Sequence, residues 1–499
     1  MVTCCISACY YNTSVTLRFT MSSTNLPDNI PLQVQRVHIT GNQSIQTKFI
    51  QNQFNELLHN QYTFTDLSNH TNKILQRLYN TQLISQAKLT VDRSSAGTEN
   101  PNIIPIKLIC EIQEKSRRYN GLRLNGRAEQ AVSSGESIGS INASHSNLFG
   151  SNESIDCSIQ YGSESSRGYS IGLNKPVNIF NKYINWYTKL YNEVDSHSYL
   201  QSFNTRQYGI STSLTSESYQ HRVTYDAVQR DTLPSHRVPD QQLLHSGIYT
   251  GPSVSILQSL TSSLKSSVKY TYTNTNTLNN MFMPTRGTYI QTSSELAGLG
   301  GDVKYVKNEL DLKHHIPINS SISCGISLLA GMIQPLTPYI NTIQKYTNNI
   351  SNGSTAQPFQ RTHLVDRFLL GGPLLLKGFK SGGVGPRDNL DALGGDIFTG
   401  LSISINSELP FNWCKQYNIH TQAFINTGNL ISLPSTNNTH TTITQQLQQY
   451  MSTSRVSAGV GLVAPSPLGR VEVNFAVPLR SQQNDQIQKF GYGVAIKFL

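Results

Sequence analysis

A lysine set in a glycine-rich stretch is the side chain whose surroundings most suggest a chemical role. Residues 366–396 read DRFLLGGPLLLKGFKSGGVGPRDNLDALGGD, with Lys377 between three leucines and a Gly-Phe pair. A lysine among glycines could cradle a phosphate, but the Gly-Lys-Ser/Thr core of a phosphate-binding loop is absent. The stretch is too irregular for a helix or a strand and too apolar for idle surface. It is therefore either an elaborate turn or a segment tucked inside a larger structure.

No other residues of the sequence combine into a catalytic or metal-binding pattern. The seven cysteines form an odd count without paired spacing, which argues against a disulfide framework and against a zinc site. No nucleophile with a partner base and no carboxylate pair stands at a convincing spacing. We therefore expect no enzymatic activity, no cofactor, and a compartment in which thiols stay reduced.

The composition indicates strands with two chemically different faces. Hydrophobic residues make up 37% of the chain and charged residues only 14%, against about 25% charged residues in a typical soluble protein. The 24 Tyr and 17 Phe argue against disorder. A transmembrane β-barrel has such a composition, because one face of each strand meets lipid and the other a polar lumen. A soluble all-β protein biased toward Asn and Ser is the alternative.

Charge and hydropathy narrow the range of partners. The net charge of +10 fits a basic surface that tolerates anionic lipid headgroups. The one dense basic patch, residues 115–127, lacks a nucleic-acid recognition module, so we expect no nucleic acid partner. No window offers the roughly 18 consecutive apolar residues of a membrane helix. The N-terminus has no basic region before its apolar stretch, which argues against a secretory signal peptide.

The chain divides into a tail, a small domain and a long β region. We expect residues 1–30 to form a poorly ordered tail. Residues 31–116 show strand and helix patterns in the order β-α-α-β-β, which predicts a small α+β domain. Residues 117–499 show no helical periodicity and predict a mainly β domain. At roughly 10 residues per membrane strand plus turns, this domain fits an antiparallel barrel of about 16 strands.

Two runs near the C-terminus show the strand pattern most clearly. Residues 470–479, RVEVNFAVPL, place apolar side chains on one face and Arg470, Glu472 and Asn474 on the other. These faces would be core and solvent in a soluble sandwich, but lipid and lumen in a barrel. Residues 489–499, KFGYGVAIKFL, alternate up to the last residue. Barrel closure requires such a strand, since the last strand must pair with the first.

The order and spacing of several motifs add a family resemblance that runs from residue 31 to residue 499. The motifs are SNLFGSNESIDCSIQYG, MPTRGTY, DRFLLGGPLLLKGF with GVGPRD and LGGD, FINTGNL, and RVEVNFAVPL with FGYGVAIKFL. With them the sequence resembles the outer-membrane protein assembly family, whose bacterial member is BamA. Within that family it is most similar to the mitochondrial branch, the central barrel subunits of the sorting and assembly machinery (SAM). The resemblance implies that residues 31–116 are a single POTRA domain.

The resemblance also implies a role for the glycine-rich stretch. In this family the loop folds back into the barrel, and an Arg-Gly-Phe core grips the inner wall. The corresponding residues here are Lys377, Gly378 and Phe379, which supply a cation, a close backbone approach and an apolar anchor. We call these three residues the lock. A lysine cannot make the bidentate contact of an arginine, so we expect Lys377 to bind the inner wall less tightly than an arginine would.

The lock needs an acceptor on the inner wall. Glu472 faces the lumen by alternation and is our candidate partner for Lys377. The alternative is that Glu472 pairs only with Arg470 or Arg455. Asn426 stands where bacterial relatives usually carry Asp; it agrees with the mitochondrial branch and cannot be an ionic partner.

The function that the resemblance implies is insertion and folding of β-barrel precursor proteins in the mitochondrial outer membrane. A weakly paired seam between the first and last strands would offer its edge to a client strand, since unpaired edges cannot be left in lipid. The closing strand carries a pattern similar to the signal in the clients' own last strands. The residues are Lys489, Gly491, Val494 and Ile496, with Gly493 as a second position where packing is weak.

The implied partners are β-barrel precursors, peripheral subunits of the assembly machinery and the lipid bilayer. The POTRA domain is expected in the intermembrane space. The alternative function is a polypeptide-translocating or passive solute channel of an outer membrane, of plastid or bacterial type. A channel without the plugging loop would conduct freely, whereas a plugged barrel would not.

Overall fold

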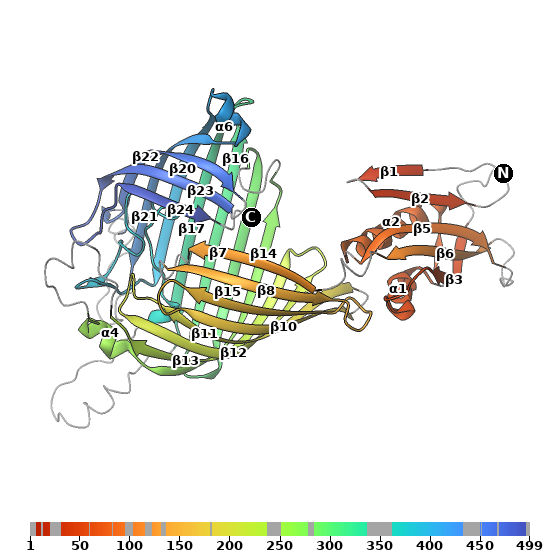
Figure 1. Cartoon of the computed structure of the whole chain (residues 1–499), viewed down its shortest axis with the longest axis horizontal. Coiled ribbons are helices and arrows are strands. Elements are labelled where there is room, and N and C mark those ends of the chain that lie inside the picture. The colour runs from red at the N-terminus through yellow and green to blue at the C-terminus, as the bar shows by residue number, and fades with distance from the viewer. Residues whose placement is uncertain are drawn as a thin grey trace, which may run out of the picture. The chain divides into compact units, whose positions relative to one another are not determined.

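The N-terminal part of the computed structural model is a small α+β domain. Its sheet contains β3 (Leu32–Thr40), β4 (Gln61–Tyr62), β5 (Ile84–Arg93) and β6 (Ile104–Glu114), and its helices are α1 (Thr47–Phe54) and α2 (Phe64–Asn80) (Figure 1). Helix α2 begins after Thr63, whose hydroxyl accepts from the Asp66 backbone N–H. The predicted β-α-α-β-β order is confirmed, with the two-residue strand β4 added between the helices.

Structure is described for residues 6–10, 13–19, 31–58, 60–81, 83–94, 103–114, 122–130, 136–179, 182–236, 251–277, 284–336, 362–432, 450, 452–466 and 469–495. Among the helices in these ranges, none is long and apolar enough to cross a membrane. Residues 115–121, which include the predicted domain boundary, lie outside the described residues, as does Ile496.

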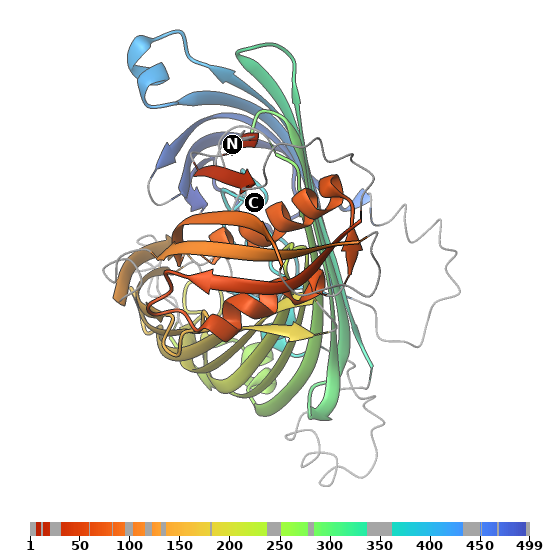
Figure 2. The ribbon, with the colours of Figure 1, turned by 90° about the vertical axis from the view of Figure 1, so that its right-hand side faces the viewer.

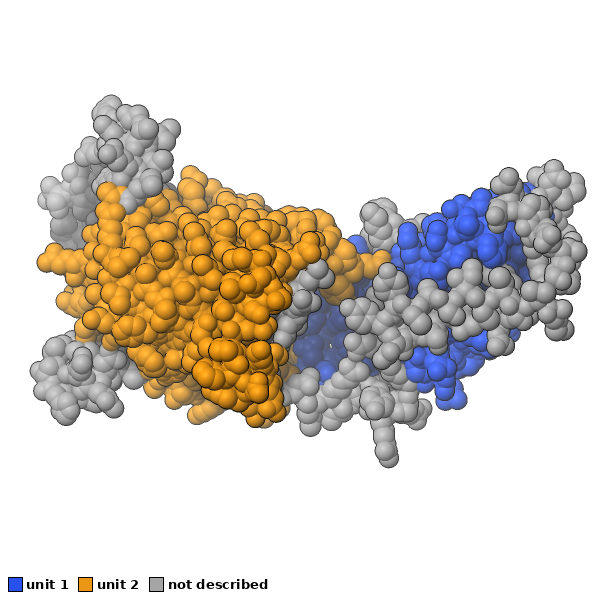
Figure 3. All heavy atoms as spheres, turned by 90° about the horizontal axis from the view of Figure 1, so that it is seen from above, with its two compact units in different colours: residues 1–124, 143–157, 172–187 blue, residues 125–142, 158–171, 188–499 orange. Residues whose placement is uncertain are grey.

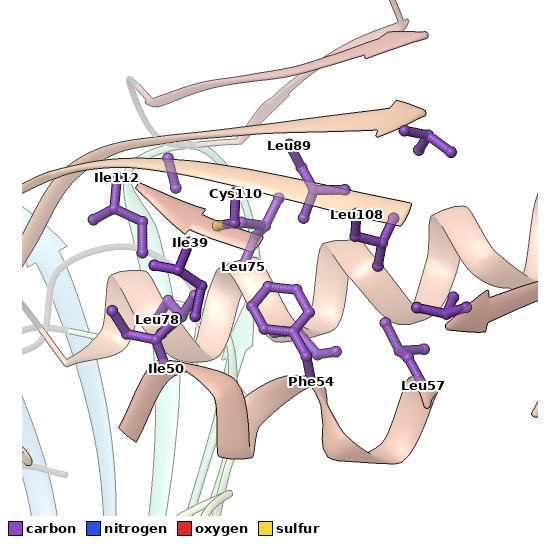
Figure 4. Close-up of a cluster of buried hydrophobic side chains, with 14 of the residues drawn as sticks. Ile39, Ile50, Phe54, Leu57, Leu75, Leu78, Leu89, Leu108, Cys110 and Ile112 are labelled. Atoms are coloured by element: carbon purple, nitrogen blue, oxygen red, sulfur yellow. The ribbon is translucent and has the colours of Figure 1, made fainter. Parts of the chain in front are cut away.

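The core of the small domain lies between the helices and the sheet. Apolar residues at helical spacing, among them Phe54, Leu75 and Leu78, are buried against Leu89 and Leu108 of the strands (Figure 4). A fully buried Leu or Phe contributes about 1.5–3 kcal/mol to folding, so this cluster is a main source of the stability of the domain.

Residues 6–10 and 13–19 differ from the predicted poorly ordered tail. They form strands β1 (Ile6–Tyr10) and β2 (Thr13–Phe19). Strand β2 pairs in parallel with β5, with Leu17 opposite Leu89. This pairing satisfies backbone groups that an uncovered edge of β5 would leave open. The alternation within TSVTLRF is the sequence signal for β2.

The largest element is an antiparallel sheet of 16 strands, in the order β24-β23-β22-β21-β20-β17-β16-β15-β14-β13-β12-β11-β10-β9-β8-β7. Figures 1 and 2 show the strands of this sheet from β12 to β24 following one curved wall. The strands are β7 (Leu122–Gln130), β8 (Ser137–Ser146), β9 (Ser154–Gly162), β10 (Arg167–Ile179), β11 (Lys182–Ser196), β12 (Phe203–Ser216), β13 (His221–Pro234), β14 (Ser262–Thr275), β15 (Gly287–Gly301), β16 (Tyr305–Pro317), β17 (Ile322–Pro335), β20 (Ile397–Glu408), β21 (His420–Ile431), β22 (Arg455–Ser466), β23 (Gly469–Arg480) and β24 (Phe490–Ala495). Strands β7 and β24 are the outermost in this order, so their mutual pairing stays a prediction.

The chain divides into two compact units (Figure 3). One contains residues 1–124, 143–157 and 172–187, and the other residues 125–142, 158–171 and 188–499. The N-terminal domain lies in the first unit. All the contacts of the glycine-rich loop described below lie within the second unit.

Side-chain burial along the large sheet is the reverse of that in a water-soluble protein. On β23, Phe475 is 52% exposed whereas Glu472 is 3% exposed. On β20, Leu401, Ile403 and Ile405 are all exposed. Apolar faces that extend over many strands are stable only against an apolar medium. The sheet is therefore the wall of a transmembrane barrel, with the apolar side chains of residues 470–479 toward lipid and the polar ones toward the lumen.

A lysine substitution on the outward face of the sheet tests whether this face contacts lipid. Ile403 lies in the middle of β20 and is 47% exposed. We expect Ile403→Lys to lower the free energy of unfolding from lipid vesicles by about 2–4 kcal/mol, because it places a cation near the bilayer centre. Leu479→Lys, near the end of β23, should cost only about 0–1 kcal/mol. A cost for Ile403→Lys within about 0.5 kcal/mol of zero would indicate a water-exposed face instead.

Candidate functional site in the barrel lumen

The glycine-rich loop lies inside the barrel. The loop, residues 362–396, belongs to the β17–β20 connection and includes the short strands β18 (Arg387–Asp388) and β19 (Asp391–Ala392). The loop's apolar side chains form a buried cluster with side chains of the wall. The loop contributes Phe368, Leu370, Leu376, Phe379 and Val384, and the wall contributes Ile333 and Leu430 among others. Burial of these side chains explains why the loop is so apolar.

Lys377 binds a buried carboxylate on β23. Its Nζ lies 2.9 Å from Glu472 Oε2 and donates to Gln422 Oε1 at 2.6 Å. It also lies 4.4 Å from the centre of the Phe424 ring, a cation–π distance. Arg470 Nη2 lies 2.8 Å from the other oxygen, Glu472 Oε1. Two of the three partners that the sequence suggested for Glu472, Lys377 and Arg470, thus bind it together, one cation on each oxygen. Burial lowers the pKa of the Lys377 ammonium, and Glu472 opposes that shift.

The two residues after Lys377 fix the loop against the wall. Gly378 has a φ of +93°, and a Cβ there would lie 3.2 Å from the Cβ of Ser457 and 3.4 Å from that of Ala476. Both the backbone conformation and the close approach therefore favour glycine. Ser457 also donates its hydroxyl to the Lys377 carbonyl at 2.6 Å. Phe379 is buried in the apolar cluster.

The side chain of Asn426 contacts the backbone of Lys377. The buried side-chain amide lies 2.6 Å from Ser402 Oγ. With its oxygen turned to the loop, it accepts from the Lys377 backbone N–H at 3.3 Å. Arg455, the other alternative partner of Glu472, instead holds Asp485 with two contacts of 2.9 and 3.0 Å.

The loop also meets the closing strand. Backbone bonds join Lys380 N to Gln486 O at 2.9 Å and Gln488 N to Gly378 O at 3.0 Å, just before β24. Within β24, a Cβ at Gly491 would lie 3.3 Å from Pro373 Cβ.

A second glycine of β24 has the same neighbour. A Cβ at Gly493 would lie 3.0 Å from Pro373 Cγ and 3.2 Å from Leu374 Cγ. The glycines of the predicted client-like signal therefore leave room for the loop, a reason that the sequence did not reveal. Lys489 is exposed and accepts through its carbonyl from the Ala476 backbone N–H at 2.8 Å, whereas nothing is described for the side chain of Val494.

A second ionic contact, which sequence reasoning missed, holds the start of the loop. Asp366 accepts from Arg230 on β13 through two bonds of 2.9 and 3.0 Å. Lys265 Nζ lies 3.6 Å from the same carboxylate, and Tyr305 donates its hydroxyl at 3.2 Å. Burial alone would raise the pKa of Asp366, but Arg230 and Lys265 hold it well below its usual range. An acidic residue inside the apolar run LVDRFLLGG is the only sequence signal for this contact.

The last part of the loop is held by hydrogen bonds from a third region of the barrel. Asp391 accepts from Ser202 Oγ at 2.7 Å and from the Ser253 backbone N–H at 2.9 Å. Asp388 accepts from the Ser255 backbone N–H at 3.0 Å, at the start of α4 (Val254–Ser259). The loop therefore bridges the lumen between β23 and the β12–β14 region. Within the described part of the chain, no group of three His, Cys, Asp or Glu side chains could hold a metal ion.

Comparison with protein families agrees with this architecture. The sequence profile of the Omp85 superfamily domain matches residues 147–498. The chain belongs to the Omp85 superfamily. The match covers nearly all of the large sheet and the whole described loop, and it confirms the family resemblance read from the order of the motifs.

Relatives of this Omp85 chain include proteins named for the sorting and assembly machinery. A SAM50-like protein of Schizosaccharomyces pombe is 28% identical over 421 residues, which cover 83% of this chain and 78% of the relative. The sorting assembly machinery 50 kDa subunit of Saccharomyces cerevisiae is 31% identical over 217 residues, or 43% of this chain and 40% of that protein. The sorting and assembly machinery component 50 homolog of Homo sapiens is 23% identical and covers 85% of this chain and 81% of the relative.

A solved structure shows the same fold. BamA from Haemophilus ducreyi lacking POTRA domains 1–3 matches with a TM-score of 0.64 at 16% identity. The match covers 99% of this chain and 89% of that one. The likeness in fold therefore extends over both the N-terminal α+β domain and the barrel of this chain.

Removal of the lock cation is the first test of the site. Lys377→Ala leaves Glu472 buried with Arg470 as its remaining ionic partner, so we expect the free energy of unfolding to fall by about 3 kcal/mol, the lower end of the range for a broken buried pair. Lys377→Arg should be tolerated, because the guanidinium can reach both Glu472 and Gln422. Unfolding of the purified barrel in detergent measures both effects.

Lys380→Ala is the matched control for this test. The two loop contacts described for Lys380 at Gln486 and Gly383 run through its backbone, which the substitution keeps. If Lys377→Ala destabilises the barrel no more than Lys380→Ala does, the ionic contact to Glu472 does not hold the loop.

Asp366 gives a pH-dependent test of the second contact. Because the folded pKa of Asp366 is depressed, its stabilisation is complete above the unfolded value of about 3.9 and is lost as the pH falls toward the folded pKa. We expect Asp366→Asn to lower the free energy of unfolding by about 3–5 kcal/mol at neutral pH. The gap to wild type should narrow below about pH 4. Asp388→Asn, in the less buried part of the loop, is the control, and an equal loss there would argue against a special role for Asp366.

Proposed function

We propose that this Omp85 superfamily member inserts and folds β-barrel precursor proteins in the mitochondrial outer membrane. The names of its relatives in the sorting and assembly machinery support this role, since the similarity to the S. pombe and human proteins extends over more than 80% of the chain. The observation that carries the proposal is the combination of a filled lumen with a sheet whose outermost strands are β7 and β24.

The proposed mechanism is templating at the seam between these two strands. A client strand entering lipid must pair its backbone groups at once, because water is absent there. An edge strand of an existing sheet supplies such a partner. Strand β24 has glycines at two inward positions, and its inner face rests on Pro373 and Leu374 of the loop rather than on side chains of its own. The role requires no catalytic residues, and we propose that the chain is not an enzyme.

The competing function is a passive channel for solutes or polypeptides. The loop does not support it, since Lys377 and Asp366 tie the same segment to the β23 and β13 walls. A polar cavity of about 290 Å³ remains in the lumen, lined by Lys189, Glu193, Asp226 and other side chains. It holds side chains of both charge signs, which gives no selectivity for one class of solute.

The proposed setting follows from the same relatives. The barrel would span the mitochondrial outer membrane with its N-terminal POTRA domain in the intermembrane space. Its partners would be precursor barrels, peripheral subunits of the machinery and the bilayer. A nucleic acid partner is not proposed.

A reversible lock of the seam tests the proposed mechanism. With the native cysteines replaced, one cysteine is placed in β7, at Leu122 or Leu124, and one in β24, at a pair with Cα atoms less than about 7 Å apart. We expect oxidation to abolish insertion of a radiolabelled porin into mitochondria that depend on the variant, and reduction to restore it. A single cysteine at Leu122 should also cross-link to the final strand of the arriving porin.

The control carries a disulfide between β20 and β21, which should leave insertion unchanged. Full insertion with the seam oxidised would show that clients enter elsewhere. Normal porin insertion in mitochondria depleted of the protein would overturn the proposed function itself.

A further inference from the structure

The turn between β20 and β21 carries a cluster of exposed aromatic side chains. It contains the short helix α6 (Asn412–Gln416), which Figure 1 shows at the end of these two strands. Phe411, Trp413 and Tyr417 are 56%, 59% and 64% exposed. The rings of Phe411 and Trp413 stack with their centres 6.5 Å apart and their planes 22° apart. Cys414 is fully buried on the other side of the turn.

The turn is held in one conformation that points these rings outward. Ile419 donates its backbone N–H to the Cys414 carbonyl at 2.8 Å, and Asn418 adopts a φ of 50° after the helix. A five-residue helix has little stability of its own in water. Polar residues would form such a turn in water equally well. The three exposed rings therefore indicate that the turn lies in a partly apolar environment.

The lipid-facing band of the barrel runs directly into this turn. Leu401, Ile403 and Ile405 on β20 and Ile425 on β21 are exposed toward lipid. The 12 residues of β20 extend over about 40 Å and, tilted by about 40°, cross about 30 Å of bilayer. This exceeds the roughly 25 Å apolar band of outer-membrane barrels. The turn therefore begins where the hydrocarbon ends.

We propose that the α6 turn is a membrane-interface anchor, with the rings of Phe411, Trp413 and Tyr417 seated at the level of the lipid headgroups. Trp and Tyr favour this depth because one end of the ring system is apolar and the other can hydrogen-bond. Lys415, exposed on the same helix, is placed to meet anionic headgroups. The inference rests on the transmembrane fold and does not depend on the proposed insertase function.

The anchor would fix the position of β21 along the membrane normal, and β21 contacts Lys377 of the lock. Strand β21 starts at His420, just after the turn, and carries Gln422, Phe424 and Asn426. These residues contact Lys377. An anchored turn would therefore keep these contact residues of β21 at one depth in the membrane while other strands move.

The tryptophan content of the chain allows a direct test. There are two tryptophans in the sequence, Trp186 and Trp413. The full-length Trp186→Phe variant, reconstituted in phosphatidylcholine–phosphatidylserine vesicles, reports on Trp413 alone. We expect lipids brominated near the carbonyl groups to quench its fluorescence several-fold more than lipids brominated near the chain ends. Aqueous iodide should quench it weakly.

The Trp413→Phe variant is the matched control. It leaves Trp186, an exposed residue within β11, whose quenching by brominated chains shows that the barrel is inserted. With insertion shown, strong iodide quenching of Trp413 and no quenching by lipid bromines would overturn the proposal. Iodide access in vesicles but protection in native membranes would assign the rings to a protein partner, and would overturn it as well.

Discussion

A charge buried in the lumen of a barrel must meet a charge of opposite sign, and this requirement orders the interior. The wall offers a carboxylate on β23, Glu472, and a guanidinium on β13, Arg230. The loop carries the complementary signs, Lys377 and Asp366, eleven positions apart in the sequence. Reversing the loop would set like charges together, which costs several kcal/mol for buried ions. Charge alone therefore gives the loop one orientation, and the apolar cluster around Phe379 fills the space between.

Patterns with a short period were predictable from sequence. The two helices, the alternation of residues 470–479 and the inward position of Glu472 all follow from periods of 3.6 and 2 residues. The inward fold of the loop came only from the family resemblance, since no local pattern encodes it. The pair of Asp366 with Arg230 joins residues 136 apart, and no rule of spacing could find it. Strand β2 was missed because its pairing with β5 depends on a partner 72 residues later.

Glycines in the closing strand illustrate that a residue can have a second role that its sequence pattern does not show. Read along the sequence, Gly491 and Gly493 weaken a strand and match a signal. In the folded protein they also leave space on the inner face of β24, which Pro373 and Leu374 of the loop fill. Both descriptions hold together, because a strand that lacks inward side chains of its own depends on the loop for its inner packing. The state of the loop and the state of the seam are thereby physically linked.

The position of the loop in the chain has a consequence for biogenesis. The loop lies between β17 and β20, yet its contacts reach back to Gln201 and forward to Ser457, 191 and 80 residues away. Contacts of such long range form late in folding, because the entropy of closing long loops must be overcome first. During synthesis, the loop has no complete binding site until β22 and β23 have been translated. Seating of Lys377 on Glu472 therefore requires nearly all strands of the large sheet, because Glu472 lies on its next-to-last strand, β23.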